Sequence, residues 1–495
     1  MTPTDLTPLN SAHYWLINAH VPAPLLVGYD APTTGDFAHV DIEIQAGVIR
    51  QILPCGDRPP TDTHPTATPP TNIPTVDLQR GMVWCGFVDM HTHLDKGHIW
   101  ERAINQGGSF DDALAAVRAD SEKNWDAEDV YRRMSFGLKC SYAHGTTAIR
   151  THLDSAGKQA QISFEVLKAA QADWAGRLTL QGVSLVPTDY FLTPDGEALA
   201  DLVATAGGVL GAVVFMADDI DAQLDRMFEL AAERQLNLDF HTDESGNPND
   251  IALRHVAAAA IRHQFSGQVV CGHCCSLAVQ SPDEVLKTIT LVQQANLGIV
   301  SLPMCNLFLQ DRNQQTSGTW ALASNLASSI PSPPIPSPPI PSPPIPSPPI
   351  AASPKAASIS QPSATPRWRG VTLLHELKHA GVRVAIASDN CRDPFFGFGD
   401  HDGLEVFTQG VRIAQLDSPY GDWCRVITTT PADLMGLPQI GRIGVGLSAD
   451  LVLFKARYFS ELLSRPQGDR IVLRQGKPID PTLPDYAELD DLLLK

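Results

Sequence analysis

The central part of the chain alternates short apolar runs with longer segments in which apolar residues recur at helical spacing. Segments 126–144 and 221–235 are typical of the second kind. The apolar runs have strand length, and eight of them follow one another: 84–93, 146–152, 178–186, 208–215, 236–241, 268–273, 298–303 and 382–389. Eight β/α repeats predict an α/β fold, a (β/α)8 TIM barrel, with an open doubly wound sheet as the alternative.

Both ends of the chain carry a different pattern, in which short strand-like runs are separated by turns. Examples are 40–44 near the N-terminus and 449–454 near the C-terminus. We expect the two ends to form one small β-sandwich-like domain together. Its two parts are expected at residues 1–80 and 436–495, with the catalytic barrel at 81–435 between them.

One segment interrupts the barrel pattern between the seventh and eighth strand candidates. Residues 331–350 are four copies of Pro-Ser-Pro-Pro-Ile, and the biased composition makes 330–366 a low-complexity insert. Proline fixes φ and has no N–H to donate, so polyproline II or disorder is expected there. We expect a tolerated surface expansion. The alternatives are a lid over the barrel mouth and a ligand for a domain that recognises polyproline II.

Three of the strand candidates end in side chains that bind metals. His91 and His93 are two residues apart in one strand, so their side chains point to the same face. His241 and Asp389 end two other strands, and strand ends meet at one mouth in a barrel. A lone His-x-His is compatible with a buried core pair, but the four residues together predict a single divalent metal, Fe²⁺ or Zn²⁺.

Two further residues have the chemistry to act beside such a metal. Glu244 lies three residues beyond His241, where a carboxylate can move a proton between a metal-activated water and a substrate nitrogen. The alternative is a carboxylate at a helix N-terminus. His273 ends the sixth strand and is interpreted as a hydrogen-bond donor rather than a fifth ligand. His152 is left open between support for the ligands and packing, and His98 is expected to be structural or exposed.

The composition of the chain argues against nucleic-acid and membrane partners. The 495 residues carry a net charge of −19, which argues against a nucleic-acid groove, and 43% are hydrophobic, enough for a large core. No leader or membrane-spanning stretch is seen, so we expect a cytoplasmic enzyme without membrane partners. Cys271 and Cys274 have zinc-like spacing but no second pair, which favours buried reduced thiols. The oligomeric state is left open, a homo-oligomer included.

Together these motifs resemble the amidohydrolase superfamily, and in particular its cytosine deaminase-like branch. The resemblance is carried by these segments: 86–96, 241–244, 272–274, 388–390 with 393–395, and 441–446 with 448–453. It implies a TIM barrel of the metal-dependent hydrolase type and one iron or zinc ion per subunit. The implied ligands are His91, His93, His241 and Asp389. The implied catalytic residues are Glu244, His273 and Asp389.

The resemblance also implies a reaction, the conversion of cytosine and water to uracil and ammonia, in pyrimidine metabolism. The expected substrate-binding residues are Thr188, Asn390 and Phe395. The branch carries a glutamine where this chain has Thr188 and an aspartate where it has Asn390, so a related aminopyrimidine is also expected. The alternatives are hydrolysis of an N-substituted aminotriazine or cyclic amide, and a non-enzymatic scaffold that presents the proline repeats. The complete ligand set argues against the scaffold.

Overall fold

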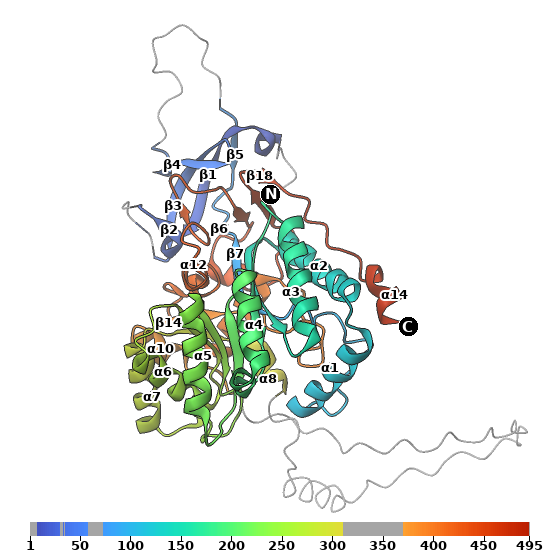
Figure 1. Ribbon diagram of the computed structural model, residues 1–495. Coiled ribbons are helices and arrows are strands. Elements are labelled where there is room, and N and C mark those ends of the chain that lie inside the picture. The colour runs from blue at the N-terminus through green and yellow to red at the C-terminus, as the bar shows by residue number, and fades with distance from the viewer. Residues whose placement is uncertain (1–6, 30–32, 34, 58–72, 310–369, 495) are drawn as a thin grey trace, which may run out of the picture.

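The computed structural model describes residues 7–29, 33, 35–57, 73–309 and 370–494. A barrel wrapped in helices forms one part of the molecule, and small sheets lie beyond one end of it (Figure 1). The proline-rich insert at 330–366 lies outside the described residues. In the part of the chain that the structure describes, no helix is both long enough and apolar enough to cross a bilayer.

Eight parallel strands form the barrel. In chain order they are β7 (Phe87–Thr92), β8 (Thr146–Asp154), β9 (Thr179–Leu185), β10 (Leu210–Val214), β11 (Leu238–Thr242), β12 (Val269–His273), β13 (Gly298–Ser301) and β14 (Arg383–Ile386). Neighbours along the chain pair in register, and parallel bridges at Val183–Val209 and Pro187–Val213 join β9 to β10. A bridge between Thr92 and Asp389 links the first and last strands, so the sheet closes. The predicted barrel is confirmed.

Helices cover the outside of the barrel. They are α1 (Phe110–Asn124), α2 (Ala127–His144), α3 (Lys158–Asp173), α4 (Pro194–Thr205), α5 (Ile220–Arg234), α6 (Ala252–Arg262), α7 (Pro282–Gln294), α8 (Pro303–Leu309), α10 (Leu374–His379), α11 (Gly403–Ala414), α12 (Thr429–Leu434), α13 (Phe459–Leu462) and α14 (Asp490–Leu493). Capping residues in the sequence explain where helices begin and end, as α2 shows. Asp126 caps α2 by accepting from the Asp129 amide, and Gly145 ends it at φ 103°. Buried Leu224 and Phe228 of α5 lie four residues apart on one face.

The small sheets combine strands from both ends of the chain, as predicted. One contains β4 (Val48–Pro54), β3 (Phe37–Gln45), β1 (His13–Pro22) and β5 (Thr75–Asp77), and another contains β18 (Lys477–Pro478), β17 (Ile471–Arg474), β16 (Leu451–Leu453) and β6 (Val83–Cys85). A two-stranded sheet pairs β2 (Leu26–Val27) with β15 (Ile443–Gly444). The short 3-10 helices are η1 (Thr7–Asn10), η2 (Ala23–Leu25), η3 (Thr188–Leu192), η4 (Ser276–Val279), η5 (Trp423–Ile427) and η6 (Tyr486–Leu489).

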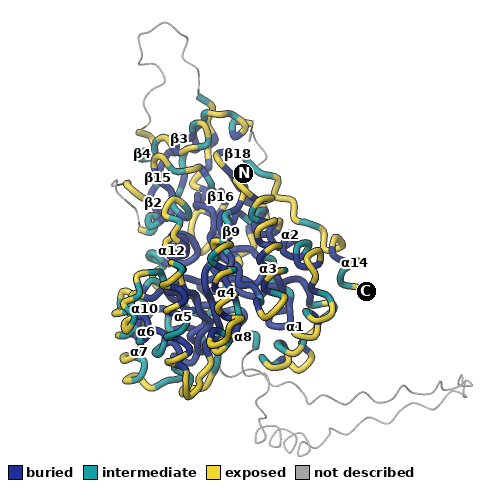
Figure 2. Tube along the Cα trace, viewed as in Figure 1, coloured by how far each residue is buried: buried dark blue, intermediate teal, exposed yellow. Residues whose placement is uncertain are grey.

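The barrel interior is a packed core at one end and a polar site at the other. Val88, Val270 and Val300 belong to a buried cluster that Leu434 of α12 also joins. Figure 2 shows buried residues along the strands inside the barrel and exposed residues on the outer faces of the helices. The core therefore fixes the strands, and their carboxyl ends carry the polar side chains of the site.

Candidate active site and metal centre

Four side chains bring their ligand atoms together at the carboxyl ends of β7, β11 and β14. His91 Nε2 lies 3.2 Å from His241 Nε2 and 3.6 Å from Asp389 Oδ1. His93 Nε2 lies 3.4 Å from His241 Nε2 and 3.2 Å from Asp389 Oδ1. Ligands at about 2.0–2.1 Å from a tetrahedral metal lie about 3.3–3.4 Å from one another. The spacing of these four atoms therefore fits one first-row divalent metal.

The electrostatics of this cluster fit a cation as well. Burial and the neighbouring basic groups hold the pKa values of His91, His93 and His241 well below 6.5, so the three imidazoles are neutral. Among the described residues, neither carboxylate oxygen of Asp389 has a hydrogen-bond partner. Buried lone pairs that face one another without a proton between them are costly, and a bound metal ion removes that cost.

A buried polar layer lies next to the ligands, toward the barrel core. The His152 ring lies against His91, tilted by 35° with 4.0 Å between ring centroids, and its Nε2 lies 3.3 Å from Asp239 Oδ1. Arg150 donates to the other oxygen of Asp239 at 2.8 Å. The sequence left His152 open between support and packing, and the structure places it in contact with a ligand. It supports His91 from the side that faces the core.

Glu244 and His273 lie together beside the ligands, and a third residue joins them. Glu244 Oε1 is 3.4 Å from His273 Nδ1. Asn306 Nδ2 donates to His273 Nδ1 at 2.9 Å and to Glu244 Oε1 at 3.4 Å. Because Nδ1 accepts from Asn306, the ring proton of His273 sits on Nε2. Burial, and then the charge of Asp389, raise the pKa of Glu244 well above 4.5.

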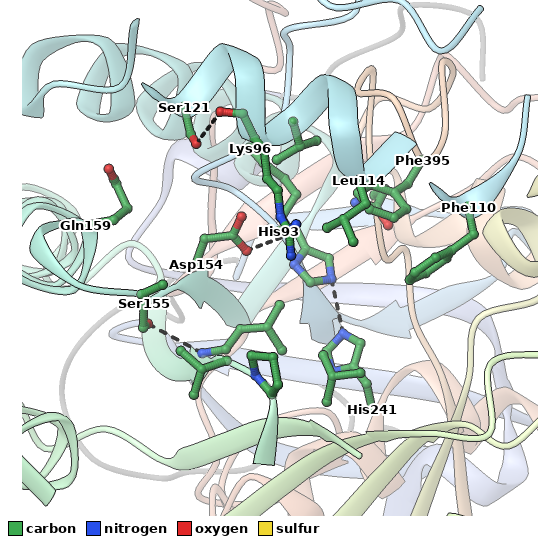
Figure 3. Close-up of a pocket in the computed structure, with 18 of the residues that line it drawn as sticks. His93, Lys96, Phe110, Leu114, Ser121, Asp154, Ser155, Gln159, His241 and Phe395 are labelled. Carbon is green, nitrogen blue, oxygen red and sulfur yellow. Dashed lines mark hydrogen bonds and ion pairs between the residues drawn. The ribbon is translucent and has the colours of Figure 1, made fainter. Parts of the chain in front are cut away.

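A cavity of about 610 Å³ opens onto this cluster and is lined by His93, His241, Glu244, His273 and Asp389. Its walls contain the apolar residues Phe110, Leu114, Val117, Val186, Pro187, Phe215 and Phe395 (Figure 3). One buried cation lies among them. Lys96 Nζ is 2.8 Å from Asp154 Oδ1 and 5.4 Å from the centre of the Phe395 ring. An apolar cleft with a few convergent polar groups is the usual form of a small-molecule site.

The structure brings two of the three expected substrate-binding residues to the cavity. Asn390 and Phe395 line it, and the Asn390 amide donates to Asp393 Oδ2 at 2.7 Å. Thr188 is a correction, because it is not among the lining residues. It begins η3, directly beyond the end of β9, and its hydroxyl donates to Gln223 Oε1 of α5 at 2.6 Å.

Several residues of the site have no clear signal in the sequence. Lys96 and Asp154 follow predicted strands, and their position at strand ends is the one signal that marks them. Asn306 lies in α8, and its sequence context does not mark it as a site residue; it can be recognised only from its contacts with the other residues of the site. His98 is buried, and its Nε2 lies 3.3 Å from His401 Nε2, which agrees with a structural residue. Cys271 is a buried free thiol, as expected.

Residues 82–479 match the family model described as the amidohydrolase family. The chain belongs to the amidohydrolase family. Members of this family depend on a metal, and the His-rich cluster described above is a candidate site for one. The match starts directly before β6, ends just after β18 and includes the whole barrel.

The chain is similar to two named relatives and to one solved structure. It is 46% identical over 496 residues to a pterin deaminase of Rhizobium rhizogenes strain K84, with all of both chains covered. It is 23% identical over 402 residues to an N-isopropylammelide isopropyl amidohydrolase of Pseudomonas sp. strain ADP, which covers 77% of this chain and 81% of that one. A 5-methylcytosine deaminase from Klebsiella pneumoniae superposes with a TM-score of 0.71 at 20% identity, covering 94% and 97%.

Proposed function

We propose that this amidohydrolase deaminates a pterin, the fused two-ring heterocycle whose amino-bearing carbon is separated from its ring carbonyl by one ring nitrogen. The observation that carries the proposal is the 46% identity to a pterin deaminase over the full length of both chains. The cavity of about 610 Å³ supports it, because it has room for two fused rings. The products are the corresponding dioxo-pteridine and ammonia.

We propose one Fe²⁺ or Zn²⁺ ion per chain, held by His91, His93, His241 and Asp389. When bound, the metal acidifies a water molecule, so that a nucleophile is available near neutral pH. The four ligand atoms lie 3.2–3.6 Å apart in the pairs measured, which supports a single ion. The choice between iron and zinc is not decided by three imidazoles and one carboxylate.

Glu244 carries the proton transfers in this proposal. Its Oε1 accepts a proton from the attacking water and delivers it to the unprotonated ring nitrogen beside the reacting carbon. The oxygen adds to that carbon, which becomes tetrahedral. Glu244 then moves the remaining hydroxyl proton to the amino group, and ammonia leaves as the carbonyl forms.

His273 and Asn306 stabilise the charge that develops on the oxygen. The Nε2–H of His273 is the donor, and the bond from Asn306 to Nδ1 keeps the proton on that nitrogen. Lys96, held by Asp154, supplies a second buried donor that suits the ring carbonyl of the pterin. Phe110 and Phe395, whose rings lie 5.4 Å apart, provide aromatic surface for the pterin rings.

Cytosine is the second candidate and stays a prediction. The 5-methylcytosine deaminase that superposes on this chain has the same fold at 20% sequence identity. In the cytosine deaminase-like branch, the residue expected to hydrogen-bond the pyrimidine corresponds to Thr188. The hydroxyl of Thr188 donates to Gln223, and Thr188 does not line the cavity. A ring without a partner for its polar edge binds weakly, so we rank cytosine below pterin.

The test is ammonia release by purified protein of measured metal content. Pterin, cytosine, an aminotriazine and a cyclic amide are offered separately, and the absorbance change of the pterin ring confirms the product. We expect turnover of pterin to exceed that of the other three. Metal-loaded protein that releases ammonia from cytosine but not from pterin would overturn the proposal. Glu244→Gln protein controls for contaminating activity.

A further inference from the structure

The cavity extends well beyond the residues that handle the reaction. Figure 3 shows Ser121 and Gln159 on the side of the cavity away from His241. These two residues belong to α1 and α3, whereas the metal ligands lie at the strand ends. A ring that reaches Glu244 with its amino group therefore leaves this outer part to whatever is attached to the ring.

Two cations line the outer part, Arg118 of α1 and Lys158 at the start of α3. Both side chains are exposed, and neither has an ion-pair or hydrogen-bond partner among the described residues. They differ in this from Lys96, whose charge is matched by Asp154. Other cations of the described surface, such as Arg234 and Arg262, are paired with carboxylates.

The local charge balance is opposite to that of the whole chain. Arg118, Lys158 and Glu122 are the charged groups of the outer wall, which gives a net charge of +1 in a chain of net charge −19. The first turn of α3 has no acidic residue, and its N-cap Gly157 makes no side-chain hydrogen bond. The positive end of that helix dipole therefore adds to the charge of Lys158.

We propose that the outer cavity recognises a negatively charged substituent on the pterin ring, a carboxylate or a phosphate ester, through Arg118 and Lys158. This inference rests on the proposed function, since it assumes a pterin at the metal end. A charged substituent accepts a charge-assisted hydrogen bond from each of these two side chains, whereas a neutral substituent makes only an uncharged contact with the cavity wall. The acidic remainder of the protein repels such a substrate in general, so the two cations decide where and how it enters.

The experiment compares kcat/KM for three pterins: 6-hydroxymethylpterin, its phosphate ester and pterin-6-carboxylate. Wild-type protein is expected to prefer at least one charged compound over the neutral alcohol, and which one it prefers identifies the group. In the double variant R118Q/K158Q we expect this preference to fall by about twofold to thirtyfold, the range for two exposed ion pairs. Raising the salt concentration lowers the wild-type preference in the same direction.

Matched controls replace exposed cations of the same two helices that do not line the cavity. K123Q in α1 and K168Q in α3 remove the same charge and are expected to keep the wild-type preference. Equal kcat/KM for charged and neutral pterins in wild-type protein overturns the inference alone. A preference for the charged pterin that is unchanged in R118Q/K158Q also overturns the inference alone. Absence of turnover of all three substituted pterins and of unsubstituted pterin overturns the proposed function and this inference with it.

Discussion

Asn306 offers the sharpest test of how the proton-handling residues are held. Its side-chain nitrogen donates to His273 Nδ1 at 2.9 Å and to Glu244 Oε1 at 3.4 Å, and the residue is buried. In Asn306→Ala both bonds are lost, and His273 Nδ1 is left as a buried acceptor without a partner. The ring is then free to carry its proton on Nδ1, where Nε2 no longer donates toward the site.

The size of the effect follows from what is lost. Leaving a buried polar group unsatisfied costs about 1–3 kcal/mol. If that cost appears in the transition state, kcat/KM falls by about 5-fold to 150-fold. We expect most of the loss in kcat, with metal content unchanged, because Asn306 is not a ligand. The assay is steady-state turnover of the substrate that wild-type protein uses best, on protein of measured metal content.

Two controls separate the site from the helix that carries it. Met304→Ala truncates a partly buried residue of the same helix α8 and is expected to lower stability while leaving kcat within about threefold of wild type. Asn306→Asp keeps the size but supplies an acceptor instead of a donor, so it favours the wrong tautomer and is expected to be as slow as Asn306→Ala. Wild-type kcat/KM in Asn306→Ala at full metal content would refute the role of the amide.

Three further predictions concern the metal, the proton shuttle and the insert. Glu244→Gln is expected to keep its metal and lose at least about a hundredfold in turnover, as measured by elemental analysis beside ammonia release; unchanged turnover removes Glu244 from the mechanism. Asp389→Ala is expected to lose both metal and activity, and full metal occupancy by elemental analysis would exclude Asp389 as a ligand. Deleting residues 331–366 is expected to leave kcat/KM nearly unchanged, whereas a large loss would revive the lid hypothesis.

The fold could be predicted because each barrel strand is an apolar run of its own. The eight predicted runs overlap the eight observed strands in order. One boundary failed, since 84–93 was taken as a single strand. The structure divides it at Gly86 into β6, which pairs with β16, and β7, which enters the barrel. A Cβ at Gly86 would lie 2.3 Å from Thr147 Cγ2, a contact between distant segments that an uninterrupted apolar run cannot reveal.

The convergence of the four candidate ligands could be predicted for a related reason, because the carboxyl ends of barrel strands meet at one mouth. Thr188 was expected from the family resemblance, and it is not among the cavity-lining residues because its hydroxyl bonds to Gln223. Asn306 and Lys96 were missed because their roles depend on partners far away in the chain. Asn306 bonds to His273, and Lys96 to Asp154. Such contacts exist only after the helices and loops have packed at the barrel mouth.

The most direct test of the central claim is the mass of the product formed from pterin in ¹⁸O-labelled water. The protein carries a measured amount of metal, and ammonia is quantified in the same reaction. We predict one labelled oxygen in the dioxo-pteridine for every ammonia released, in proportion to the metal bound. Metal-loaded protein that leaves the pterin unlabelled and releases no ammonia would contradict the account.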